Sequence, residues 1–95
     1  MKTLKPSTQY KKDLKRIRNN PRKAAELLKV LRLLEREQDI PAEYKPHILT
    51  GDYDGCMECH ILGDFLLIWI DQETNQIDLV RLGSHSELFG KGSKR

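Results

Sequence analysis

The chain has 95 residues, of which 38% are hydrophobic and 33% charged, values typical of one domain, 1–95, with one modest core. The net charge of +3 hides an asymmetry: residues 1–36 carry twelve Lys or Arg and three acids, whereas residues 37–90 carry two and eleven. A basic tail, 91–95, follows. No apolar run approaches the ~20 residues that a membrane helix requires, so we expect no signal peptide, no membrane span and a cytoplasmic protein.

The first half predicts a short edge strand, 1–5, and two helices. Ser7 or Thr8 is a suitable cap for the first helix, whose apolar residues recur at i, i+4 and i+7: Tyr10, Leu14 and Ile17. Pro21 begins a second helix that runs to about Gln38 and carries a wide apolar stripe. The two helices are therefore expected to form a hairpin that covers one face of a sheet.

The second half predicts three strands, 56–62, 65–71 and 76–83, joined by turns short enough to require antiparallel pairing. The middle strand is apolar without a break and is expected to be covered on both faces. Residues 39–50 contain two prolines and are expected to be a loop. With a short helix from Ser86, the order predicts a two-layer α+β fold.

Residues 56–60 read C-M-E-C-H, which matches the C-x-x-C-H pattern of covalent haem attachment. Alternation along a strand places Cys56, Glu58 and His60 outward and Cys59 toward the core, so the two thiols lie on opposite faces. The same geometry disfavours a zinc site, and a reducing cytoplasm disfavours a disulfide. We therefore expect no haem, no required metal and no other cofactor.

The three histidines are expected to converge on the uncovered face of the sheet. His47 precedes the sheet, His60 faces outward, and His85 follows the last strand. Asp64 lies in a turn, and Arg81 is expected to share the uncovered face with Ile77 and Leu79 if the strand is regular. A lone histidine is more often structural, Asp64 alone is an ordinary turn residue, and Arg81 alone is an ordinary surface ion pair.

Together, such groups are suited to RNA cleavage. A base removes the proton of the 2′-hydroxyl, an acid protonates the leaving 5′-oxygen, and a cation stabilises the phosphate. Histidine serves either proton role near neutral pH. Aromatic residues such as Phe65 and Phe89 could stack an unpaired base, or could belong to the core.

Four ordered motifs extend along most of the chain: YKPHILTG from Tyr44, CH at 59–60, GDF at 63–65, and R-x-G-x-H-x-x-L-F-G from Arg81. In this order they resemble the YafQ branch of the RelE-type toxins. That family comprises small bacterial toxins of type II toxin–antitoxin pairs. They are ribosome-dependent endoribonucleases that cut messenger RNA in the decoding site and are neutralised by a bound antitoxin.

The resemblance implies a RelE-like fold and a set of site residues. The catalytic positions are His47, His60, Asp64 and His85, with Arg81 and Phe89 in support. His85 and Asp64 are expected to be the proton-transfer pair, and Arg81 to stabilise charge. His47 and His60 are expected to contact the phosphate or to exchange protons, and which group is acid and which is base stays open. At Phe65 the family often has Trp, so stacking could be retained here but an indole N–H bond could not.

The partners implied are messenger RNA, the ribosome and an antitoxin. Phosphates of ribosomal RNA are expected to meet Lys11, Lys12, Lys15, Arg16 and Arg18. An antitoxin segment is expected to lie against the basic helices and to reach the histidines or displace Phe89. Two alternatives remain, a non-catalytic toxin of the same fold that inhibits DNA gyrase and a plain RNA-binding module. Neither function requires histidines that converge.

Overall fold

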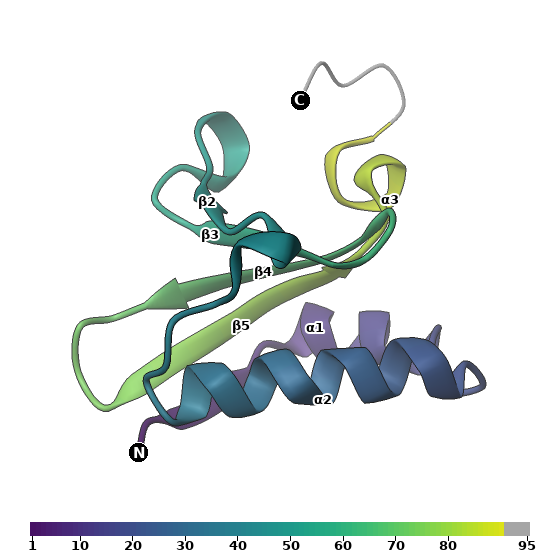
Figure 1. The fold of residues 1–95 in the computed structure, drawn as a ribbon. Helices are drawn as coiled ribbons and strands as arrows, with labels where there is room; N and C mark the ends of the chain where they lie inside the picture. The colour runs from purple at the N-terminus through teal and green to yellow at the C-terminus, as the bar shows by residue number, and fades with distance from the viewer. Residues whose placement is uncertain (91–95) are drawn as a thin grey trace.

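The computed structural model describes residues 1–90 and shows two layers, a five-stranded sheet and a pair of helices (Figure 1). In chain order the elements are β1 (Thr3–Pro6), α1 (Thr8–Lys15), α2 (Pro21–Glu35), η1 (Ala42–Tyr44), β2 (His47–Ile48), η2 (Gly51–Tyr53), β3 (Met57–Leu62), β4 (Phe65–Asp71), β5 (Gln76–Gly83) and α3 (His85–Phe89), where η marks a single 3₁₀ turn. The predicted α+β fold is confirmed. None of the helices within residues 1–90 is long and apolar enough to cross a membrane.

The sheet has the order β1-β5-β4-β3-β2. The three long strands form two antiparallel hairpins, and β1 adds to the edge in parallel with β5. Leu66, Leu67 and Ile68 in β4 are each 0% exposed. The prediction of a central strand covered on both faces is therefore confirmed.

The helices begin where the sequence predicts. Ser7 caps α1 by accepting a hydrogen bond from the N–H of Tyr10, and Asn20 caps α2 with Pro21 in its first turn. α2 ends at Glu35, earlier than expected, because Glu37 adopts a positive φ of 58° and its N–H bonds the carbonyl of Leu34. That reversal ends the helix as a C-terminal cap does.

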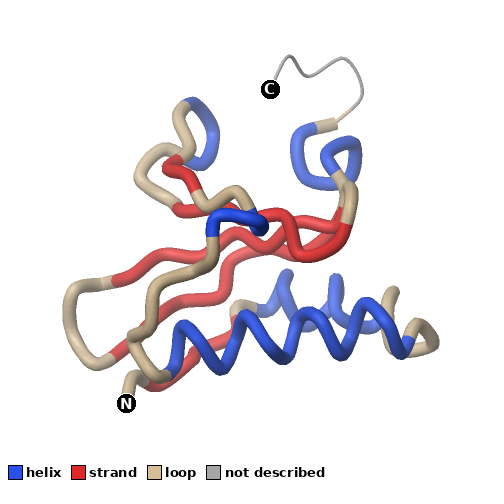
Figure 2. Tube along the Cα trace, viewed as in Figure 1, coloured by secondary structure: helices blue, strands red, loops and turns tan. Residues whose placement is uncertain are grey.

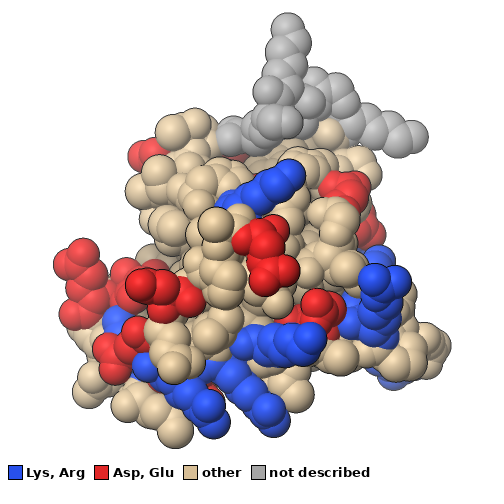
Figure 3. Space-filling view, in the orientation of Figure 1, with Lys and Arg blue, Asp and Glu red and all other residues tan. Residues whose placement is uncertain are grey.

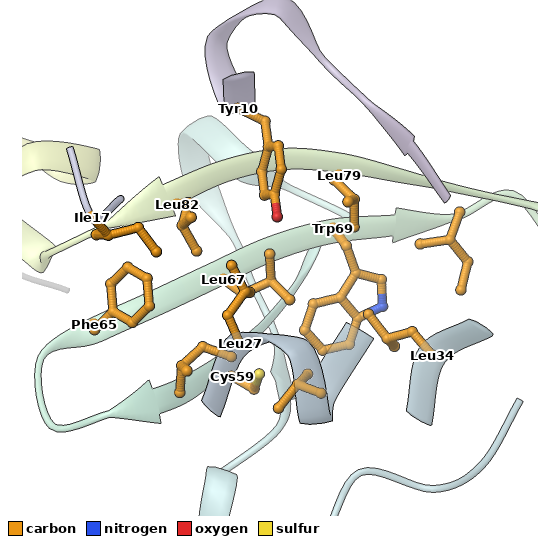
Figure 4. Close-up of a cluster of buried hydrophobic side chains, with 13 residues drawn as sticks. Tyr10, Ile17, Leu27, Leu34, Cys59, Phe65, Leu67, Trp69, Leu79 and Leu82 are labelled. Atoms are coloured by element: carbon orange, nitrogen blue, oxygen red, sulfur yellow. The ribbon is translucent and has the colours of Figure 1, made fainter. Parts of the chain in front are cut away.

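The main core lies between the helix pair and the sheet (Figures 1 and 2). Figure 4 shows Phe65, Leu67 and Trp69 of β4 facing side chains of both helices. Cys59 and Leu82 of the neighbouring strands complete this layer. Burial of these apolar side chains supplies most of the stabilising free energy of such a small domain.

A smaller cluster covers part of the other face and consists of Leu49, Cys56, Leu66, Ile68 and Leu88. It forms because β2 and the 3₁₀ turn η2 bring Leu49 and Tyr53 over this face of the sheet. β2 lies within residues 39–50, which were predicted to be a loop. Cys56 and Glu58, expected to face outward, do lie on this side but are only 5% and 2% exposed. The expectation of exposure at these two positions was wrong because a segment without apolar periodicity covers them.

Arg81 lies on the face opposite the helix pair, as expected, but the expectation that Ile77 and Leu79 share that face was wrong. Ile68 pairs with Arg81, but the next residue, Trp69, pairs with Leu79, so β5 has an extra residue in a β-bulge. Leu79 belongs to the main core, whereas Arg81 shares the opposite face with Ile68. The bulge reverses the alternation that a regular strand would keep.

Candidate active site

The structure brings the three histidines together on the face of the sheet opposite the helix pair. The ring centroids of His47 and His60 are 6.2 Å apart, and those of His60 and His85 are 5.7 Å apart. The rings come from β2, β3 and the first residue of α3. Positions separated by up to 38 residues in the chain therefore form one surface.

Strand register explains this convergence. His47 pairs with Glu58, and His60 lies two residues farther along β3 on the same face. His60 pairs with Leu66, which pairs on its other side with Gly83 at the end of β5. α3 begins two residues after Gly83, so His85 lies next to His60 across the sheet.

Gly83 allows the start of α3 to turn tightly against the sheet. A Cβ at this position would lie 2.9 Å from Oε1 of Glu87. That oxygen accepts the N–H of Ser84, while Ser84 in turn caps the N–H of Glu87. This capping box sets the direction in which α3 leaves the strand.

Asp64 holds His85 from the turn between β3 and β4. Its Oδ1 lies 2.6 Å from Nδ1 of the His85 ring and accepts the backbone N–H of His85 at 3.2 Å. These two hydrogen bonds from His85 hold the pKa of the Asp64 carboxyl below its usual value. Because Nδ1 of His85 is hydrogen-bonded to Asp64, Nε2 is the ring nitrogen available for proton transfer.

His47 lies between two acceptors. Its Nε2 is 3.0 Å from Oε1 of Glu58, and its Nδ1 is 2.8 Å from the carbonyl oxygen of Lys45. The imidazolium form donates to both at once. Glu58 was not predicted as a site residue, although it lies two residues before His60 in β3 and therefore on the same face.

Phe89 and Tyr53 form one wall of the cluster. The Phe89 ring lies 5.9 Å from that of His85, and Tyr53 meets Phe89 edge-on at 5.4 Å. Phe65 does not belong to this wall: it is 3% exposed in the main core, with Nζ of Lys23 5.1 Å from its ring centroid. Of the two roles considered for Phe65, base stacking is therefore wrong and membership of the core is correct, because its ring lies on the helix side of the sheet.

Arg81 is bound to a buried carboxylate that the sequence analysis missed. Asp13 of α1 is 1% exposed and accepts Nε of Arg81 at 2.8 Å, Nη2 at 3.3 Å and the N–H of Leu82 at 3.0 Å. Burial raises the pKa of Asp13, but the hydrogen bonds from Arg81, Leu82 and Gln9 outweigh it and leave that pKa below its usual value. Asp13 raises the pKa of Arg81 in return.

The five basic residues predicted to meet RNA are exposed on α1 and the turn after it. In the view of Figure 3, Lys and Arg side chains gather over the helical layer. Arg16 differs from the other four because Nη1 lies 3.1 Å from Oε2 of Glu87 in α3. Arg16 and Asp64 also line one hollow of about 150 Å³, so this end of the helical layer reaches the edge of the histidine site.

The two cysteines are free and buried on opposite sides of the sheet, Cys56 in the small cluster and Cys59 in the main core. Burial raises the pKa of Cys56, and burial with the nearby Glu58 raises the pKa of Cys59 to about 12. Both thiols therefore remain protonated and unreactive at neutral pH. No single face of β3 presents both to a porphyrin, although the absence of haem stays a prediction.

Glu58, His60 and His85 form a group whose ligand atoms lie within 4.8 Å of one another. Oε2 of Glu58 is buried and has no hydrogen-bond partner among residues 1–90. A carboxylate with two imidazoles is a suitable donor set for zinc or copper. The pattern of the two cysteines in this strand gives no sign of this donor set, because Glu58, His60 and His85 come together only in the folded chain.

Residues 2–90 match the family described as bacterial toxin of type II toxin–antitoxin system, YafQ. The chain belongs to this family. The mRNA interferase toxin YafQ of Escherichia coli is 32% identical over 85 residues, 88% of this chain and 91% of that protein. A putative toxin YafQ of Haemophilus influenzae is 37% identical over 51 residues, which is half of each chain.

Solved structures of relatives share the fold. A metal-bound toxin from Helicobacter pylori is 41% identical with a TM-score of 0.83, covering 94% of this chain and 100% of that one. YafQ in the E. coli DinJ–YafQ toxin–antitoxin complex is 30% identical with a TM-score of 0.82, covering 94% and 98%. The prediction of a YafQ-type toxin is thus confirmed.

Proposed function

We propose that this YafQ-family toxin is an endoribonuclease that cleaves messenger RNA at the histidine cluster. The observation that carries the proposal is the convergence of His47, His60 and His85, with Asp64 bonded to His85, on one face of the sheet. The E. coli relative is an mRNA interferase. The substrate implies that the protein acts in the cytoplasm, where messages are translated.

The arrangement suggests a division of the proton transfers. The 2′-oxygen of the substrate loses its proton to a base and attacks the adjacent phosphorus, and the 5′-oxygen leaves with a proton from an acid. His85, oriented by Asp64, presents Nε2 for one transfer. His60 serves the other, because no hydrogen bond to its ring is found among residues 1–90 and its ring lies beside that of His85. Asp64 thus orients His85 rather than exchanging protons with the substrate.

His47 is less suited to proton transfer than His60 and His85. Both of its ring nitrogens already face acceptors, the carbonyl oxygen of Lys45 and the carboxylate of Glu58, so neither is left to take a proton from the substrate. Arg81, which the sequence analysis assigned to charge stabilisation, donates to Asp13 and Tyr53. We assign direct contact with the phosphate to His60. His47 and Arg81, whose nitrogen atoms already face partners within the protein, are assigned supporting positions beside it.

The non-catalytic alternatives need no such cluster. A toxin that inhibits DNA gyrase by binding, or a plain RNA-binding module, gains nothing from three adjacent imidazoles. Adjacent imidazoles repel one another when charged, so a cluster of them has a cost in stability. Such clusters are typical of catalytic sites. The ring separations of 6.2 and 5.7 Å therefore favour the nuclease.

The decisive experiment supplies purified protein with a synthetic message, either free or bound to programmed ribosomes. We expect cleavage of the ribosome-bound message, with a 5′-hydroxyl on the downstream fragment mapped by primer extension. Addition of the cognate antitoxin should stop it. Intact message in both arms, together with inhibition of gyrase supercoiling by the same preparation, would show that the alternative function is correct.

Binding to the ribosome is proposed to use the exposed cations of the α1 region. We omit Arg16, which pairs with Glu87, and reverse the charges of Lys11, Lys12, Lys15 and Arg18. Affinity for ribosomes should fall and become less dependent on salt, because fewer phosphate counterions are released. The matched control reverses the charges of Arg22, Lys29 and Arg32 of α2 and of Arg36, which follows it. Equal losses in the two variants would show that no defined contact lies on α1.

The same site is proposed to bind a transition-metal ion that inhibits cleavage. The Helicobacter pylori relative is a metal-bound toxin, and Glu58, His60 and His85 fit such an ion here. An ion on those imidazoles would occupy the atoms needed for proton transfer. Zinc should inhibit wild-type cleavage and a chelator should restore it, whereas zinc binding should be weaker in Glu58→Gln. That no metal is required for activity stays a prediction.

A further inference from the structure

One buried polar network takes no part in the proton transfers and joins α1 to α3. It begins at Asp13, a carboxylate that is 1% exposed, a position that charged residues occupy only when paired. Asp13 binds the Arg81 side chain and the N–H of Leu82. It lies beside the part of β5 that β1 leaves unpaired, since the pairing of β1 ends at Leu79.

The other edge of the guanidinium meets Tyr53. Nη1 of Arg81 donates to the Tyr53 hydroxyl at 3.2 Å, and that hydroxyl donates to the carbonyl oxygen of Leu88 at 3.0 Å. Leu88 lies in α3, a five-residue helix whose last carbonyl groups have no partner within the helix. The network therefore ends on the element that carries His85.

We propose that Asp13, Arg81 and Tyr53 are positioning residues, which hold the C-terminal end of α3 and thereby fix the orientation of His85. The proposal rests on the function proposed above. A five-residue helix is not stable alone, so its orientation depends on its attachments. The capping box of Ser84 and Glu87 holds the N-terminal end. Tyr53 holds the other end through the Leu88 carbonyl and through its edge-on contact with Phe89.

A second link from α1 reaches the beginning of α3 and is weaker. Arg16 and Glu87 form an ion pair of 3.1 Å, but their side chains are 53% and 41% exposed. Exposed pairs of this kind contribute little to stability because water and salt screen them. The buried connection through Asp13 is therefore the one on which the placement of α3 depends.

The test uses Tyr53→Phe, because Asp13→Asn would leave a buried cation without its partner and could unfold the protein. The phenylalanine keeps the ring contact with Phe89 and loses both hydrogen bonds of the hydroxyl. We expect kcat for cleavage of ribosome-bound message to fall ~10- to 100-fold, since small misplacements of catalytic groups have effects of that size. KM should be unchanged. The matched control is Tyr44→Phe, which removes a hydroxyl outside the network.

A second measurement separates positioning from general destabilisation. The hydrogen bonds from His85 lower the pKa of Asp64, so a loosened α3 should let that pKa rise toward its usual value in Tyr53→Phe. Carboxyl ¹³C NMR reports it directly. A variant that merely lowers the melting temperature would leave the Asp64 titration unchanged.

The outcomes distinguish this proposal from the function on which it rests. Wild-type kcat and an unchanged Asp64 pKa in Tyr53→Phe, with His85→Ala inactive, would overturn the positioning role and leave the nuclease intact. Wild-type cleavage by His85→Ala would overturn the catalytic assignment. In that case the Asp64 titration in Tyr53→Phe still decides whether Tyr53 positions His85.

Discussion

The two faces of the sheet are built from the same strands, but one is covered by apolar side chains and the other carries the polar groups of the site. The face toward α1 and α2 buries an apolar cluster that draws on both helices and on β3, β4 and β5. The other face buries five small or aliphatic side chains and surrounds them with histidines and carboxylates. Packing on the first face stabilises the fold, so polar groups on the second can be held at some cost in free energy.

The comparison predicts that substitutions on the two faces have separable effects. His85→Ala should lower cleavage by at least ~10²-fold, because it removes a proton-transfer group. Its free energy of unfolding should change by less than ~1 kcal/mol, since the side chain is 41% exposed and its only ion-pair partner among residues 1–90, Asp64, is more exposed still. Ribosome-bound message and urea unfolding are the two assays, with Glu73→Gln in the distant β4–β5 turn as control. A large loss of stability would show that the site is part of the structural core.

On the helix-covered face the effect should be reversed. Leu67 is 0% exposed in the main core, and Leu67→Ala should reduce the free energy of unfolding by about 2–5 kcal/mol. The fraction that stays folded should cleave at the wild-type rate. Inactive but fully folded Leu67→Ala protein would show that the two faces are coupled, contrary to this view.

The pair of Asp64 and His85 gives the site face a pH dependence. Because hydrogen bonds from His85 lower the pKa of Asp64 in the folded state, any stability from this pair is present above the usual Asp pKa and is lost as pH falls through the lowered value. The Asp64 side chain is 62% exposed, so the effect on stability should be small. In His85→Ala the Asp64 pKa should rise toward its usual value, which ¹³C NMR measures. An identical titration in both proteins would mean that the hydrogen bond is absent in solution.

The cysteines test the smallest difference between the faces. Alternation along the strand places Cys59 toward the core and Cys56 outward, and on that basis alone Cys59→Ala is expected to cost stability and Cys56→Ala little. Since Cys56 is also buried, we now expect a measurable loss for both, about 1 kcal/mol or less, and more for the 0%-exposed Cys59. Denaturant unfolding under reducing conditions provides the measurement. If Cys56→Ala is as stable as wild type, the original expectation holds and the small cluster adds no stability.

Much of the site could be predicted because its residues belong to ordered motifs. Spacing and resemblance predict four catalytic residues, His47, His60, Asp64 and His85, and the structure brings all four together. Neither feature predicts a role for Asp13 or Glu58. No local pattern distinguishes a buried carboxylate from a solvated one, because its burial depends on segments far away in the chain.

Local periodicity by itself determined the three long strands and the two helices, because these depend on side chains a few residues apart. Only the tertiary structure decided which residues share the other face. The bulge in β5 placed Arg81 and Leu79 on opposite faces, and the segment that contains β2 and η2 buried Cys56 and Glu58. Phe65 was likewise placed on the helix side. Register shifts and loop placement balance contacts across the whole chain, which no short window of sequence contains.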